Sequence, residues 1–128
     1  GYAALRITDN FDPYVSLILG ETDADANKQM LICYRNHGES SRLGLYYCAG
    51  DDEPYAYTAA HLTMGALATD GEWHVALVDF SAADGFFGKL KTLRIDPYDG
   101  LQAKVGDGID IAWIAFVPAD DTALDYVQ

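Results

Sequence analysis

The sequence predicts an all-β protein: an antiparallel β-sandwich of the jelly-roll kind with about eight strands. Apolar residues recur with a period close to two far more often than with the period of 3.6 typical of a helix. The extended segments are short and evenly spaced, and Gly, Pro, Asp and Asn gather between them. Short strands at such spacing are typical of sandwiches and barrels.

The first two predicted strands are apolar runs that end at turn signals. Tyr2–Thr8 is rich in Leu and Ile and ends at Asp9-Asn10. Tyr14–Leu19 reads Tyr-Val-Ser-Leu-Ile-Leu. The residues that follow, 20–28, are acidic and small, so we expect a loop there or at most one helical turn.

The middle of the chain predicts three further strands. Gln29–Arg35 and Leu43–Ala49 are apolar runs, and the polar residues 36–41 between them predict a hairpin loop. Gly50-Asp51-Asp52-Glu53-Pro54 then breaks the chain, and Tyr55–Met64 resumes an extended pattern. Tyr46 and Tyr47 must point to opposite faces of a regular strand, so at most one of them is exposed.

The last three predicted strands follow the same rules. Asp70-Gly71 marks a tight turn directly before Glu72–Phe80, in which apolar residues occupy both faces. Leu90–Asp96 and Ile109–Phe116 complete the set, and a loop over residues 97–108 separates them.

Length and charge restrict the function classes. A chain of 128 residues suits one domain, which we expect to be a sandwich over residues 1–118 followed by a solvated tail over 119–128. With 8 basic and 20 acidic side chains the net charge is −12. This charge argues against nucleic acid as a partner, because phosphates are held mainly by Lys and Arg. It also argues against docking on an anionic membrane, and no apolar run is long enough to insert into one.

The chain begins at Gly1 without an initiator methionine; a piece of a longer polypeptide is the expected origin, and a tag or processing is the alternative. Its two cysteines, Cys33 and Cys48, flank the predicted hairpin. A disulfide across the hairpin is one interpretation, and two buried free thiols are the other and the favoured one.

Several segments resemble a known family. They read Asp70-Gly71-Glu72-Trp73-His74-Val75, Val78-Asp79-Phe80-Ser81, Gly85-Phe86-Phe87-Gly88-Lys89-Leu90, Leu93-Arg94-Ile95-Asp96-Pro97 and Gly106-Asp107-Gly108-Ile109 up to Phe116. In this order they resemble the galactose-binding-domain-like β-sandwich of bacterial extracellular proteins, which include carbohydrate-binding modules of glycoside hydrolases and surface adhesins. The resemblance implies an extracellular or cell-surface location, a polysaccharide or glycan partner, and further domains in the parent polypeptide.

Calcium is the one ion that the sequence leaves open, and no other cofactor is expected. The resemblance implies a structural calcium ligand in the last strand, where this chain has Ala112, with Asp110 two residues earlier as the replacement. The residues themselves indicate a second candidate site at Glu21, Asp23 and Asp25, because alternating oxygen side chains converge on a hard cation. A solvated acidic loop is the favoured interpretation there.

The sequence does not predict an enzyme. It contains no nucleophile elbow, zinc-protease motif or phosphate-binding loop. Each histidine lacks a partner at a recognised spacing, so a structural role is favoured for all of them.

Carbohydrate binding is predicted by aromatic and planar polar residues in loops. Sugar C–H patches stack on aromatic rings, and sugar hydroxyls bond to Asp, Asn, Gln and Arg. Nine tyrosines exceed what packing requires, and loops at one end of a sandwich commonly carry ligands. The predicted sugar-binding residues are Tyr55, Tyr57, Phe86, Phe87, Tyr98, Asp99 and Arg35.

Two tryptophans and Arg94 are assigned mainly to structural roles, and the role of Arg35 is left open. Trp73 and Trp113 fall in apolar strands, so we expect them to be buried. Arg94 is expected to pair with a buried carboxylate, Asp79 or Asp96, while pairing and sugar binding are weighed equally for Arg35.

The sequence therefore predicts a non-catalytic carbohydrate-binding module that targets a larger secreted or surface protein to a glycan through loop aromatics. The alternative is a structural or interaction spacer module without a sugar site. Exposed loop aromatics favour the first function, and packed ones favour the second.

Overall fold

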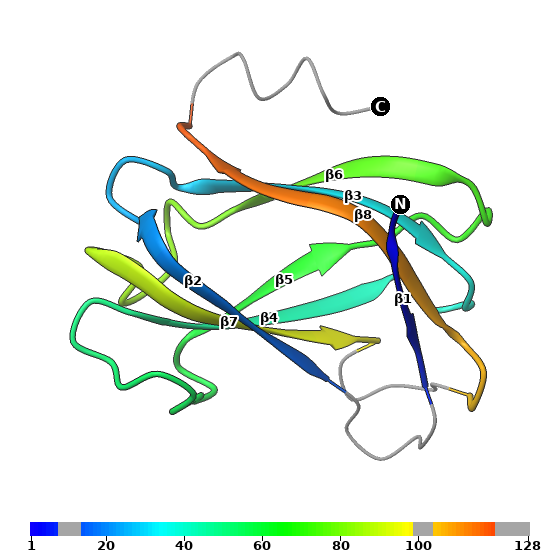
Figure 1. Ribbon diagram of the computed structural model, residues 1–128, viewed down its shortest axis with the longest axis horizontal. Coiled ribbons are helices and arrows are strands. Elements are labelled where there is room, and N and C mark those ends of the chain that lie inside the picture. The colour runs from blue at the N-terminus through cyan, green and yellow to red at the C-terminus, as the bar shows by residue number, and fades with distance from the viewer. Residues whose placement is uncertain (8–13, 99–103, 120–128) are drawn as a thin grey trace.

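The computed structural model describes residues 1–7, 14–98 and 104–119, and these form two facing antiparallel sheets without a helix (Figure 1). Each sheet has four strands. The strands are β1 (Ala3–Arg6), β2 (Val15–Asp23), β3 (Gln29–Asn36), β4 (Arg42–Ala49), β5 (Leu62–Ala66), β6 (Trp73–Asp79), β7 (Lys89–Pro97) and β8 (Gly108–Val117). The prediction of an all-β sandwich is confirmed. Most of the expected tail, residues 120–128, lies outside the described residues.

The strand order is β1-β8-β3-β6 in the first sheet and β2-β7-β4-β5 in the second sheet. Consecutive strands therefore lie in opposite sheets, except for β4 and β5 (Figure 1). The hairpin predicted at residues 36–41 is wrong, because β3 pairs with β6 and β8 whereas β4 pairs with β5 and β7. The loop instead carries the chain from one sheet to the other.

The core lies between the sheets and is built from alternate residues of each strand. In β3 the inward residues are Met30, Ile32 and Tyr34, and in β4 they are Leu43, Leu45 and Tyr47. All six are at most 2% exposed. Burying a side chain of this size contributes about 1.5–3 kcal/mol, so this period-two pattern supplies most of the drive to form the sandwich.

The two cysteines are both free, but only Cys48 is buried as the favoured interpretation predicts, whereas Cys33 is half-buried. Cys33 alternates with the inward residues of β3, and Cys48 alternates with those of β4. Their side chains therefore point away from the core on opposite outer faces of the sandwich. A disulfide between them would have to cross both sheets.

The expected burial of the tryptophans is wrong. Trp73 is half-buried and Trp113 is 39% exposed. The core takes Val78 from β6 and Ile114 and Phe116 from β8, so the alternation along these strands places both indoles on the outer face of the first sheet.

The segment expected to be extended over Tyr55–Met64 is a strand only from Leu62 onward. Residues 51–61 form a loop against the outer face of the second sheet. Tyr55 has a positive φ of 69°, and its backbone N–H donates to the Oγ1 atom of Thr92 on β7 at 3.2 Å. This loop brings two tyrosines over the sheet.

Candidate functional site

The predicted sugar-binding residues do not form one site. Tyr55, 52% exposed, and the half-buried Tyr57 lie on the loop over the second sheet. Arg35 lies on β3 in the first sheet. Phe87 is 45% exposed in the loop before β7, and Asp99 lies outside the described residues. Arg35 therefore lies on the other sheet from Tyr55 and Tyr57, whereas the ring of Phe87 lies against Gly50 at the start of the tyrosines' loop.

Phe86 and Tyr98 were expected to be exposed, and this is wrong. Phe86 is 3% exposed and stacks on Phe80 with ring centroids 4.5 Å apart. Tyr98 is 1% exposed, and its hydroxyl lies 2.7 Å from Asn36 Oδ1 and 3.0 Å from the carbonyl oxygen of Gly108. Burial raises the pKa of Tyr98 to about 12. Neither ring is available to a ligand.

A cluster that we call the tyrosine surface lies on the outer face of the second sheet. It consists of Tyr14, Tyr46 and Tyr57 around Arg94. Arg94 on β7 lies opposite Tyr46 on β4 and, on its other side, opposite Ser16 on β2. Tyr57 reaches the same place from the loop, where its hydroxyl donates to Ser16 Oγ at 3.1 Å. The three rings thus come from three separate chain segments.

Arg94 holds the tyrosine surface together. Its Cζ atom lies 3.9 Å from the ring centroid of Tyr14, 5.0 Å from that of Tyr46 and 5.9 Å from that of Tyr57. Its Nε and Nη2 atoms each donate to one carboxylate oxygen of Asp96 at 2.8 Å. The expected pairing with Asp96 is confirmed, and it fixes the guanidinium as a platform for the rings.

The rings are open to solvent to different degrees. Tyr14 is 57% exposed, whereas Tyr46 and Tyr57 are half-buried. Ile18 on β2 and Met64 on β5 are also exposed on this face, at 75% and 41%. The surface is therefore apolar and aromatic, and the charge of its central arginine is balanced by Asp96.

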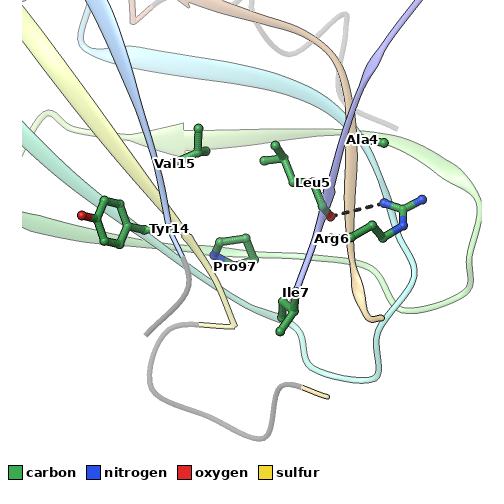
Figure 2. Close-up of a pocket in the computed structure, with 7 residues that line it drawn as sticks. All are labelled: Ala4, Leu5, Arg6, Ile7, Tyr14, Val15 and Pro97. Carbon is green, nitrogen blue, oxygen red and sulfur yellow. Dashed lines mark hydrogen bonds between the residues drawn. The ribbon is translucent and has the colours of Figure 1, made fainter. Parts of the chain in front are cut away.

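A cleft of about 320 Å³ opens between β1 and β2, beside the tyrosine surface. Its middle is lined by apolar side chains, among them Leu5, Val15 and Pro97. Tyr14 and Arg6 line its two ends and lie on opposite sides of it (Figure 2). Because its polar side chains do not converge, the cleft has fewer of the features of a sugar site than the tyrosine surface has.

A second cluster, which we call the aspartate cluster, lies on the outer face of the first sheet. Its centre is Asp110 on β8, whose side chain is fully buried. One carboxylate oxygen lies 2.8 Å from Arg6 Nη1, and the other lies 2.8 Å from Arg35 Nη2 and 2.7 Å from His37 Nε2. The sequence predicts Asp79 and Asp96 as buried carboxylate partners and Asp110 as a replacement calcium ligand. In this structure Arg6, Arg35 and His37 contact both carboxylate oxygens of Asp110.

The surroundings of Asp110 change its acidity. Burial by itself would raise the pKa of this carboxyl, but hydrogen bonds from His37, Arg35 and Arg6 outweigh burial and lower the pKa to about 2. Because an ionised carboxylate has no hydrogen to donate, the Nε2 atom of His37 carries the hydrogen in their contact. The hydrogen bonds that Arg35 donates to Asp110 Oδ2 raise the pKa of the Arg35 guanidinium.

We expect the Asp110 carboxylate to make the free energy of unfolding decrease at low pH. A pKa lowered from 3.8 to about 2 contributes about 2 kcal/mol that is complete above pH ~4 and is lost as the pH falls from ~4 to ~2. Urea unfolding at pH 5 and at pH 2.5 measures this loss. The variant Asp110→Asn should lose about 2 kcal/mol less than the wild-type chain between these pH values. Equal losses in both chains would contradict the assignment.

The aspartates at and after the end of β2 accept hydrogen bonds from backbone N–H groups. Asp23 Oδ1 accepts the backbone N–H groups of Asp25 and Ala26 at 2.9 and 3.2 Å, and Asp25 Oδ2 accepts that of Gly88 at 3.1 Å. The side chain of Glu21 lies outside the described part. Within that part, no three His, Cys, Asp or Glu side chains are grouped to hold a metal ion. The calcium site in this loop stays a prediction.

Comparisons with protein-family models, with curated proteins and with solved structures find no match to this chain. Over residues 1–7, 14–98 and 104–119 there is no helix long and apolar enough to cross a membrane.

Sequence reasoning missed Tyr14, Tyr46 and Arg94 as members of one site. A signal was present for one part of the site: Arg94 and Asp96 are two residues apart and so share one strand face. What the sequence does not show is which strands are neighbours.

Proposed function

We propose that this protein is a non-catalytic carbohydrate-binding module that binds a glycan on the tyrosine surface. The observation that carries the proposal is the gathering of three tyrosine rings around Arg94, with Tyr14 57% exposed. The rings of Tyr14 and Tyr57 stack on sugar C–H faces, and the tyrosine hydroxyls bond to sugar hydroxyls. The site thus lies on a sheet face and includes Tyr57 and, at its edge, Tyr55.

Two further observations support this function. The strand order 1-8-3-6 and 2-7-4-5 fits a jelly roll, the architecture of the galactose-binding-like modules that the sequence resembles. The balanced pair of Arg94 and Asp96, in a chain of net charge −12, favours a neutral glycan over a polyanion at this surface. Such a module would attach a secreted or surface protein of a bacterium to its glycan.

The test is a screen of neutral plant, algal and host polysaccharides with the purified chain, followed by titration of the best ligand. Tyr14→Ala is expected to weaken binding about tenfold, because it removes the most exposed ring. Its unfolding free energy should stay within about 0.5 kcal/mol of the wild-type value. Repeating the titration with a chelator shows whether calcium takes part.

Tyr2→Ala is the matched control, since Tyr2 is 54% exposed but lies on the first sheet. It should bind the neutral glycan as the wild-type chain does. If the wild-type chain binds none of the polysaccharides, the spacer function replaces this proposal. If it binds one and Tyr14→Ala binds it equally well, the tyrosine surface is not the site.

A further inference from the structure

The aspartate cluster contains more cationic groups than its single carboxylate neutralises. Two arginines and one histidine surround Asp110, and both arginines keep their charge at all working pH values. The nearby Glu39 is itself paired with Lys104 at 3.7 Å. In a chain of net charge −12, this is a place where positive groups are concentrated.

These cationic side chains are partly open to solvent, whereas the carboxylate between them is not. The exposed fractions are 39% for Arg6, 29% for Arg35 and 34% for His37, compared with 0% for Asp110. Asp110 is therefore covered by Arg6, Arg35 and His37. Its carboxylate fixes the positions of these side chains and does not contact a ligand itself. An approaching anion would meet the guanidinium edges first.

An aromatic pair lies against the same arginine. The Cζ atom of Arg35 is 4.7 Å from the ring centroid of Trp73 and 5.6 Å from that of Tyr2. The two rings contact each other edge to face at 5.4 Å, and Tyr2 is 54% exposed. Register places Arg35 opposite both Asp110 on β8 and Trp73 on β6, so the arginine, its carboxylate and one indole share a row of the first sheet, and Tyr2 contacts that indole.

We propose that this row, together with Arg6 and Tyr2 beside it, is a second binding site, for a sugar ring that carries a carboxylate. Arg6 and Arg35 bind the carboxylate, and Tyr2 and Trp73 contact the ring. The inference does not depend on the glycan function proposed above, because the tyrosine surface lies on the other sheet. The ligand class also differs: the tyrosine surface takes a neutral sugar, and this site takes an anionic one.

Three probes separate the contributions of the ring and of the charge. Glucuronate has both a sugar ring and a carboxylate. Glucose has only the ring, and inorganic sulfate has only the charge. Each is titrated at physiological ionic strength and followed by the indole N–H signal of Trp73, identified with Trp73→Phe. Glucuronate is expected to shift this signal and to bind at least about tenfold more tightly than either other probe. Sulfate or glucose that binds as tightly as glucuronate overturns the proposal.

Variants locate the site. Arg6→Gln should weaken glucuronate binding about tenfold, and Arg6→Lys should restore part of the affinity. Arg42→Gln should leave the affinity for glucuronate unchanged, because Arg42 is an exposed arginine at the start of β4 in the second sheet. Tyr14→Ala should also leave it unchanged, so the two proposed sites fail or succeed separately. Glucuronate affinity that is the same with and without Arg6 overturns the assignment.

Discussion

Replacing Asp110 with asparagine is expected to lower the free energy of unfolding by about 3 kcal/mol. Removing one partner of a buried ion pair costs about 3–5 kcal/mol, because the opposite charge is left without compensation. Here the side chains of Arg6 and Arg35 are 39% and 29% exposed, so water replaces part of the lost interaction and the lower end of that range applies. The asparagine keeps the shape of the side chain but not its charge.

Urea unfolding of the variant and the wild-type chain at pH 7 measures this difference. Asp51→Asn is the matched control, since Asp51 is exposed in the loop after β4, and its effect should stay within about 0.5 kcal/mol. A loss below about 1 kcal/mol for Asp110→Asn would mean that the positions of Arg6, Arg35 and His37 do not depend on this carboxylate.

Phe86→Ala is expected to destabilise the protein by about 3–5 kcal/mol, the usual cost of truncating a buried phenylalanine. Phe86 lies between Phe80 and Phe116, with centroid distances of 4.5 and 6.4 Å, and its ring meets that of Tyr47 edge to face at 5.4 Å. Its removal leaves a cavity lined by three aromatic rings, and the close-packed sheets cannot fill it without repacking these rings.

The neighbouring residue supplies the control. Phe87 is 45% exposed, and Phe87→Ala should cost about 1 kcal/mol or less. Thermal or urea unfolding of both variants tests the contrast directly. Equal effects of the two changes would contradict the placement of Phe86 in the core and return both residues to the list of candidate ligand contacts.

This pair of phenylalanines shows how far sequence reasoning reached in the site. Two adjacent aromatics in a loop have the same local signals, so both were predicted to bind sugar. Their separation into core and surface depends on two rings that contact Phe86: Tyr47 on β4, and Phe80 directly after β6. Tyr98 was misplaced for the same reason, because its hydroxyl finds Asn36, which is 62 residues away in the chain.

The opposite faces of Tyr46 and Tyr47 were predictable, because alternation along a strand is a local property. The sequence did not predict which of these two tyrosines points into the core. The structure buries Tyr47 at 1% exposure and leaves Tyr46 beside Arg94, because Leu43 and Leu45 fix the inward parity of β4. The tyrosine surface therefore became visible only once β2, β7 and β4 were seen to be neighbours.

The sequence by itself determined the eight strands and the all-β class, since hydrophobic alternation and turn residues act within a few residues of each other. Only the tertiary structure decided the partners of the charged side chains. Arg35 and Asp110 are 75 residues apart and meet because β3 lies next to β8. Strand order depends on the burial of whole sheet faces, a sum over the entire chain that no single segment encodes.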